Sequence, residues 1–145
     1  MAAMQPDFEK RLKDAIGAFN AHDVEGYLSF STEDVIVENL ATGEFINGKG
    51  EARASLKRAF AAIPDIKVEI KSFFSSGNRQ CVEYVASGTP RGELPGGIPA
   101  TGKSFSVRGV GVSELREGKT CRVTQYGDSS TMLQQLGILP ALPQK

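Results

Sequence analysis

The sequence is poor in metal-binding side chains. Its 145 residues include one histidine, His22, and two cysteines, Cys81 and Cys121, which lie far apart and outside any CxxC motif. A structural zinc site takes about four such ligands, so a zinc site is nearly excluded. We expect both cysteines to be reduced and to act as packing residues.

The sequence also lacks an excess of charge and a long apolar run. Lys plus Arg and Asp plus Glu both number 17, so we expect neither a nucleic acid nor a membrane as partner. No stretch of about 18 apolar residues occurs, as a membrane span would need. Residues 1–8 show neither the charged region nor the apolar core of a signal peptide. A cytoplasmic location is therefore expected.

The composition that remains is typical of a globular domain. Hydrophobic residues make up 40% of the chain and charged residues 23%. A chain of this length can bury roughly 70% of its unfolded surface without disulfides or metals. We predict one domain over residues 1–145, with tails at 1–6 and 138–145.

The first half of the chain is rich in helical patterns. Apolar residues recur at helical spacing between Phe8 and Phe19, which predicts an amphipathic helix over about 7–20. Asp23 is placed to cap a second short helix. A third apolar stripe runs from Ala52 to Ile63 and ends before Pro64.

The second half of the chain alternates as strands do. Period-two patterns predict strands near 35–39, 66–71 and 80–87, followed by a hairpin over 105–127 and a short helix. The class is therefore α+β: a curved antiparallel sheet wrapped around helices, forming a cone-shaped barrel with an apolar cavity.

Two features of this sheet point to a cavity wall. Gly109 and Gly111 fall on one face of the first hairpin strand, where glycine is kept when something needs the space beside it. The irregular segment 88–102 contains Leu94 and Ile98, and these would suit a loop folded over a hydrophobic mouth.

Several short motifs together resemble a known family. The chain looks like a SnoaL-like polyketide cyclase of the nuclear transport factor 2-like, ketosteroid isomerase-like superfamily, and the resemblance covers almost its whole length. The motifs are Phe19-Asn20-Ala21-His22-Asp23, Ala41-Thr42-Gly43-Glu44, the loop from Gly97 to Lys103, Glu117-Gly118-Lys119, Tyr126-Gly127-Asp128 and Gln135-Leu136-Gly137.

The resemblance also shows which catalytic groups are replaced. The proton-shuttling aspartate of ketosteroid isomerases falls on Asn39, and their two oxyanion donors fall on Ala15 and about Gly111. The acid/base aspartate of the polyketide cyclases falls on Gln125, and their histidine falls on about Gly111. Amides do not take up a carbon-bound proton, and Ala and Gly have no side-chain donor.

The remaining candidates each have a functional and a structural interpretation. Asp128 is a weak candidate for catalysis, and it also has the sequence context of a helix N-cap. Gln125 and Asn39, on otherwise apolar faces, either orient a ligand or bond to each other or to backbone. Tyr84 and Tyr27 either donate hydrogen bonds to a ligand or serve as packing residues.

The resemblance implies a cofactor-independent cyclase or isomerase that acts on a small apolar, polyketide-like carbonyl compound without metal. It also implies a homodimer formed through the outer sheet face. The alternative is a non-catalytic module that binds a small molecule or another protein. An ionisable side chain that meets Gln125 or Asn39 inside the cavity would favour the enzyme. A cavity lined only by amides, hydroxyls and hydrocarbon would favour the binding module.

Overall fold

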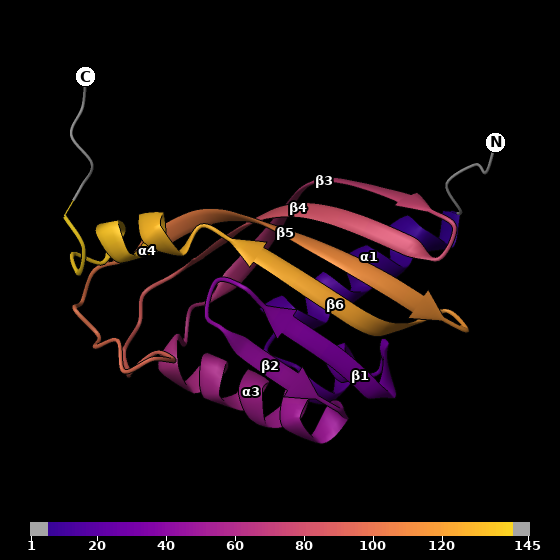
Figure 1. The fold of residues 1–145 in the computed structure, drawn as a ribbon, viewed down its shortest axis with the longest axis horizontal. Helices are drawn as coiled ribbons and strands as arrows, with labels where there is room; N and C mark the ends of the chain where they lie inside the picture. Colours follow the sequence, from indigo (N-terminus) through magenta and orange to yellow (C-terminus); the bar gives the residue numbers. More distant parts are fainter. Residues whose placement is uncertain (1–5, 141–145) are drawn as a thin grey trace.

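The computed structural model describes residues 6–140 (Figure 1). Along the chain the elements are α1 (Pro6–Asn20), α2 (Val24–Leu28), β1 (Ser31–Asn39), β2 (Glu44–Asn47), α3 (Lys49–Ala62), β3 (Lys67–Ser76), β4 (Arg79–Gly88), β5 (Phe105–Arg116), β6 (Lys119–Gly127) and α4 (Ser129–Gln135). In this part of the chain no helix is long and apolar enough to cross a membrane.

The predicted α+β class is confirmed. The strands form one open, six-stranded sheet in the order β2-β1-β6-β5-β4-β3. All neighbouring strands are antiparallel except β1 and β6, which run parallel with Asn39 opposite Gln125. The predicted all-antiparallel pairing is therefore wrong for this one pair of strands. The parallel contact brings the first and last strands of the chain together inside the sheet.

One strand was not predicted. The glycine-rich sequence between Gly43 and Gly50 indicates turns, whereas Glu44–Asn47 forms the edge strand β2. This strand has four residues and lies between Gly43 and Gly48, which both have positive φ, so it is too short for a periodic pattern. Its backbone is held by antiparallel pairing with β1, and that contact exists only in the folded sheet.

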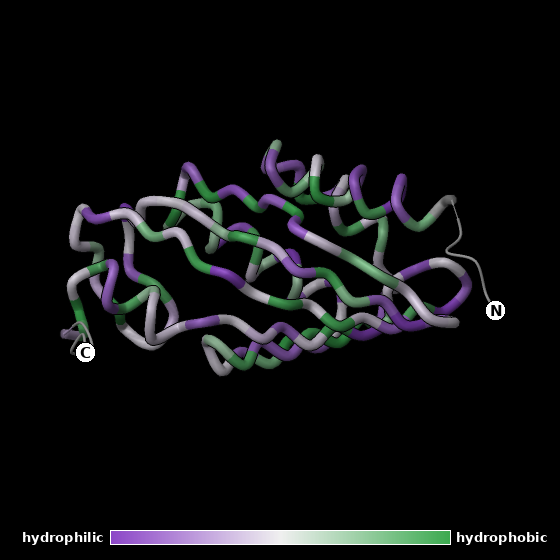
Figure 2. The backbone as a smooth tube through the Cα atoms, turned by 90° about the horizontal axis from the view of Figure 1, so that it is seen from above, coloured by the Kyte–Doolittle hydropathy of each residue, from purple (hydrophilic) through white to green (hydrophobic). Residues whose placement is uncertain are grey.

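The helices cover one face of the sheet. Helix α1 packs against α2 and β3, and α3 packs against β1 and β2; in Figure 1, α1 is seen behind the strands and α3 below them. The apolar face of α1 meets β3 where the rings of Phe8 and Phe73 contact edge to face at 5.5 Å. Along the strands, hydrophilic and hydrophobic residues alternate (Figure 2), as expected for a sheet with one face covered.

The turn between α1 and α2 is held by local contacts. His22 adopts a positive φ of 57°, and its ring stacks on Phe60 at 4.1 Å. The carboxylate of Asp23 accepts a hydrogen bond from the backbone N–H of Gly26 at 3.0 Å, which confirms the predicted cap. This corner aims the side chains of α2 toward the sheet.

The buried apolar residues form two clusters. One contains Leu28, Val35 and Ala52, and it lies between α2, β1 and α3. The other contains Ile63, Leu94, Phe105 and Leu136, with Ile98 and Ile138 packed against it. Ile138 belongs to the predicted tail 138–145, of which residues 141–145, like residues 1–5, lie outside the described residues.

The loop 88–102 is part of this second cluster. Leu94 is 6% exposed and forms an isolated bridge with Ile98, and neither residue lines the main cavity. The expectation that they fold over a cavity mouth is therefore wrong. Their apolar side chains instead pack on α4 and the start of β5.

Leu136 is the most buried side chain of that cluster, at 1% exposure. We expect Leu136→Ala to lower the free energy of unfolding by about 2–5 kcal/mol, because the cavity left behind cannot refill. Leu139→Ala, at 41% exposure three residues further on, should change it little. Urea denaturation of both variants measures this difference. Equal effects would show that α4 does not depend on this cluster.

Candidate functional site

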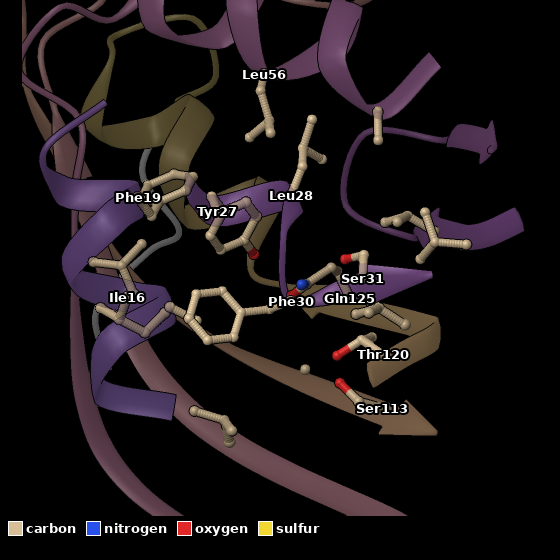
Figure 3. Close-up of a pocket in the computed structure, with 18 of the residues that line it drawn as sticks. Ile16, Phe19, Tyr27, Leu28, Phe30, Ser31, Leu56, Ser113, Thr120 and Gln125 are labelled. Atoms are coloured by element: carbon tan, nitrogen blue, oxygen red, sulfur yellow. The ribbon is translucent and has the colours of Figure 1, made fainter. Parts of the chain in front are cut away.

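A cavity of about 380 Å³ lies between the helices and the covered face of the sheet. Its lining is mainly apolar, with Ile16 and Phe19 from α1, Leu28 from α2 and Leu56 from α3 opposite the strands (Figure 3). Volumes of this size accommodate small organic ligands. The polar groups of the lining therefore decide what the cavity can do.

Tyr84 and Gln125 form a hydrogen-bonded pair on the cavity wall. The Tyr84 hydroxyl donates to Oε1 of Gln125 at 2.8 Å, from β4 to β6 across the intervening strand β5. Burial raises the pKa of Tyr84 above its ordinary value, and the neighbouring Tyr27 raises it further. The phenol therefore stays protonated at neutral pH and acts as a donor.

The two glycines of β5 make room for this pair. A Cβ at Gly109 would lie 2.7 Å from Cζ of Tyr84, and a Cβ at Gly111 would lie 3.2 Å from Oε1 of Gln125. The space that the sequence predicted beside these glycines is thus occupied by the Tyr84 ring and the Gln125 amide. Any side chain at either position would move one member of the pair.

Two hydrogen-bond donors at the cavity wall have no partner among the described residues: one belongs to Gln125 itself and the other to Tyr27. Nε2 of Gln125 donates no hydrogen bond within residues 8–140, whose side chains the structure describes. The hydroxyl of Tyr27 likewise has no partner in that part of the chain, and burial raises its pKa. Both residues line the cavity, so Nε2 and the Tyr27 hydroxyl are available to a ligand.

Asn39 uses its side chain locally. Its Oδ1 accepts hydrogen bonds from the backbone N–H groups of Ala41 at 3.0 Å and Thr42 at 3.3 Å, which shapes the turn into β2. Of the interpretations offered for Asn39, these contacts match the one in which its side chain bonds to backbone. The residue still lines the cavity, and it lies opposite Gln125 on β6 and opposite Glu44 on β2.

Glu44 brings a carboxylate into the cavity lining, and the sequence analysis did not identify it as a site residue. It forms the third member of a row across β6, β1 and β2, after Gln125 and Asn39. Its Oε2 accepts a hydrogen bond from the hydroxyl of Ser55 at 3.1 Å and lies 3.9 Å from Arg58. The sequence signal for this residue is the alternation of Glu44 and Ile46 with exposed residues in a short strand. Gly43 and Gly48 on either side make the same segment resemble a turn.

Arg11 is a second charged residue that the sequence analysis missed. From α1 its guanidinium donates to the carbonyl of Phe30 at 3.0 Å and to Oγ1 of Thr120 at 2.7 Å, and it lines the cavity. Burial lowers the pKa of the guanidinium from its ordinary value. Position 11 follows Phe8 by three residues and precedes Ala15 by four, so helical spacing alone placed it on the apolar face.

Asp128 lies away from the cavity. It is exposed, and its Oδ1 accepts a hydrogen bond from the backbone N–H of Thr131 at 3.0 Å as the N-cap of α4. The Thr131 hydroxyl, the Thr131 N–H and Ser130 together hold the pKa of Asp128 below its ordinary value. These contacts are those of a helix N-cap, the second of the two interpretations given for Asp128.

Solved structures with the same architecture define the class of the protein. TsrD from Streptomyces laurentii is 20% identical with a TM-score of 0.83, over 95% of this chain and 100% of its own. A Catenulispora acidiphila protein described as having a ketosteroid isomerase-like fold is 18% identical with a TM-score of 0.76, over 91% and 96%. IdmH from Streptomyces antibioticus, a candidate polyketide cyclase, is 23% identical with a TM-score of 0.75, over 89% and 97%. The fold is therefore nuclear transport factor 2-like, of the ketosteroid isomerase-like kind.

A narrower assignment comes from the sequence family. Residues 10–136 match the model of the SnoaL-like polyketide cyclase family, so the chain belongs to that family. This confirms the resemblance drawn from the short motifs. No curated protein matches the chain.

The fit of Tyr84 against Gly109 can be tested by adding one methyl group. We expect Gly109→Ala to lower the free energy of unfolding by about 1–3 kcal/mol, because the new Cβ overlaps the tyrosine ring. In a Tyr84→Ala background the same change should cost much less, since the overlapping atoms are gone. Thermal or urea denaturation of the double-mutant cycle measures the coupling.

Gly50→Ala provides the matched control, because a Cβ there meets nothing within 4 Å inside helix α3. We expect that variant to be unchanged or more stable, by up to about 1 kcal/mol. Additive effects of Gly109→Ala and Tyr84→Ala would contradict the close fit.

Proposed function

We propose that the protein is a cofactor-independent cyclase or isomerase that acts on a small, largely apolar carbonyl compound bound in this cavity. The observation that carries the proposal is the half-buried Tyr84–Gln125 hydrogen bond, which leaves donors directed into a mainly apolar space. Membership of the SnoaL-like polyketide cyclase family supports the same class of reaction.

The pair supplies donors to the carbonyl oxygen of the bound compound. Tyr84 donates to Oε1 of Gln125, which fixes the amide so that Nε2 is presented to the ligand. The Tyr27 hydroxyl offers a second donor. Preorganised donors in a site shielded from water stabilise the negative charge that develops on an enolate oxygen.

The reaction also needs a group that takes up a proton from carbon. Gln125 and Asn39 are amides and do not do this, and Asp128 is outside the cavity. Among the described residues that line the cavity, Glu44 is the one carboxylate. We assign Glu44 as the general base, with the Ser55 hydroxyl orienting its Oε2.

Glu44 also bears on the non-catalytic alternative. A binding module would need only shape and donors, and its cavity could consist of amides, hydroxyls and hydrocarbon. Glu44 instead places an ionisable group in one row with Asn39 and Gln125. This arrangement supports the enzyme over the binding module.

Exchange of the carbon-bound protons of 2-tetralone with deuterated solvent, followed by NMR, tests the proposal without knowledge of the natural substrate. The wild-type protein should accelerate exchange above the buffer rate. We expect Glu44→Gln to slow exchange by about a hundredfold or more, since it removes the base. Tyr84→Phe should slow it by roughly tenfold through loss of the fixed amide donor.

Asp128→Asn is the matched control, because it also converts a carboxylate to an amide while asparagine caps helices as well as aspartate does. Its exchange rate should equal that of the wild type. Tight binding of 2-tetralone with no acceleration would favour the binding module. A folded Asp128→Asn protein without activity would transfer the acid/base role to Asp128.

We also propose that the protein forms a homodimer through the uncovered face of the sheet. Large apolar side chains are exposed there, among them Phe74 at 62%, Phe45 at 56% and Tyr126 at 50%. Each precedes or follows a cavity-facing or helix-facing residue on its strand, so it points to the other face. Burial of such side chains against a second copy would stabilise the pair of chains.

Sedimentation equilibrium tests the dimer. We expect the wild type at twice the monomer mass and Phe74→Lys shifted toward the monomer, because a charge is costly in an apolar interface. Leu139→Lys, at 41% exposure beyond helix α4 and outside the strands, should leave the mass unchanged. A monomeric wild type at micromolar concentration would overturn the proposal.

A further inference from the structure

We propose that Arg11 and Gln80 form a carboxylate-binding subsite at one end of the cavity, so that the substrate is a carboxylic acid. This rests on the proposed function, which places the reacting carbonyl at Tyr84 and Gln125. The second anchor would fix the orientation and the length of the compound.

The guanidinium of Arg11 has N–H donors that its described hydrogen bonds do not use. It makes three hydrogen bonds, to Phe30 O, to Thr120 Oγ1 and, at 3.4 Å, to Oε1 of Gln80. A guanidinium carries about five N–H donors, so two remain. Arg11 lines the cavity, where the acceptor for those donors would come from a ligand.

The charge of Arg11 is not balanced by its surroundings. Among the residues whose side chains the structure describes, 8–140, no carboxylate lies within 4.0 Å of the guanidinium, whose nearest described aromatic contact is the Phe30 ring at 5.9 Å. A half-buried cation is stabilised by a nearby anion. One carboxylate carries the single negative charge that matches one guanidinium.

Gln80 provides a second donor beside Arg11. It is only 8% exposed and lines the cavity beside Arg11. Because arginine only donates, Oε1 of Gln80 must face Arg11, and Nε2 must point away from it. Within residues 8–140 this Nε2 donates no hydrogen bond, and it is not one of the fully buried unpaired atoms, so it is accessible to a molecule in the cavity.

The surroundings of Arg11 and Gln80 are polar, whereas the cavity lining as a whole is mainly apolar. Ser113 pairs with Gln80 across β4 and β5, and Thr120 begins the cavity-lining part of β6. Figure 3 shows the hydroxyls of Ser113 and Thr120 pointing to the same side, into the cavity. Together these groups can complete the hydrogen bonds of a carboxylate whose charge Arg11 neutralises.

The two ends of the cavity define the length of the compound. Thr120, beside Arg11, and Gln125 are both on β6 and are separated by roughly 16 Å of extended strand. After allowing for the hydrogen bonds at each end, a compound about as long as two fused rings with a substituent at each end fits. Its carboxylate and its reacting carbonyl would be on opposite ends.

A matched set of probes tests this without the natural substrate: 6-acetyl-2-naphthoate, its methyl ester and 2-acetylnaphthalene. Isothermal titration with wild-type protein should show the acid bound at least about tenfold more tightly than the ester, because charge-assisted hydrogen bonds are lost in the ester. The comparison needs no variant, so it stays informative whatever Arg11 does for folding.

Variants then assign the preference to the two residues. Arg11→Gln should remove the preference for the acid while leaving affinity for 2-acetylnaphthalene within about threefold, and Gln80→Met should reduce the preference in part. Lys10→Gln removes the same charge from the exposed face of α1 and should preserve the preference. Urea denaturation confirms that each variant is folded.

The possible failures are distinguishable. If the neutral ketones bind but the acid is not preferred, the subsite is wrong and the carbonyl site stands. If the acid is preferred equally in Arg11→Gln and wild type, the carboxylate is bound elsewhere and the proposal is overturned. If none of the three probes binds at millimolar concentration, the carbonyl site and the carboxylate subsite both fall.

Discussion

The hydrogen bond between Tyr84 and Gln125 is the contact on which the cavity depends. It spans β5, and it forms only because Gly109 and Gly111 leave that strand without side chains at the crossing point. The pair fixes two polar groups on an apolar wall and satisfies both the phenol and one end of the amide. Without the glycines, the ring and the amide would be displaced into the space that a ligand needs.

This contact also explains how the site differs from the family pattern. The resemblance implies that the cyclase aspartate corresponds to Gln125 and the histidine to about Gly111, and these two residues are direct partners in the β5–β6 register. Glycine at position 111 leaves open the space that the Gln125 amide occupies. Gln125 and Gly111 therefore act together: because Gly111 has no side chain, Tyr84 from β4 reaches the Gln125 amide across β5.

The two ends of the cavity differ in charge. Arg11 lies at the end where β1 and β6 begin, while Glu44 lies at the far end, beside the last residues of both strands. Between them the lining is mainly apolar, so neither charge neutralises the other through direct contact. An elongated compound with one anionic end would be held in one orientation, with its other end toward the donors and Glu44.

The sequence by itself determined the class of fold and the helices and strands that follow its apolar stripes and alternating patterns. It also determined the caps at Asp23 and Asp128 and the space beside Gly109 and Gly111. Local spacing is sufficient for these features because each depends on residues a few positions apart. Only the tertiary structure decided the parallel β1–β6 contact, the edge strand β2, the partner of Tyr84, and the places of Arg11 and Glu44. Those depend on strand neighbours that are distant in the chain, such as Asn39 and Gln125, and no local pattern specifies which strands will meet.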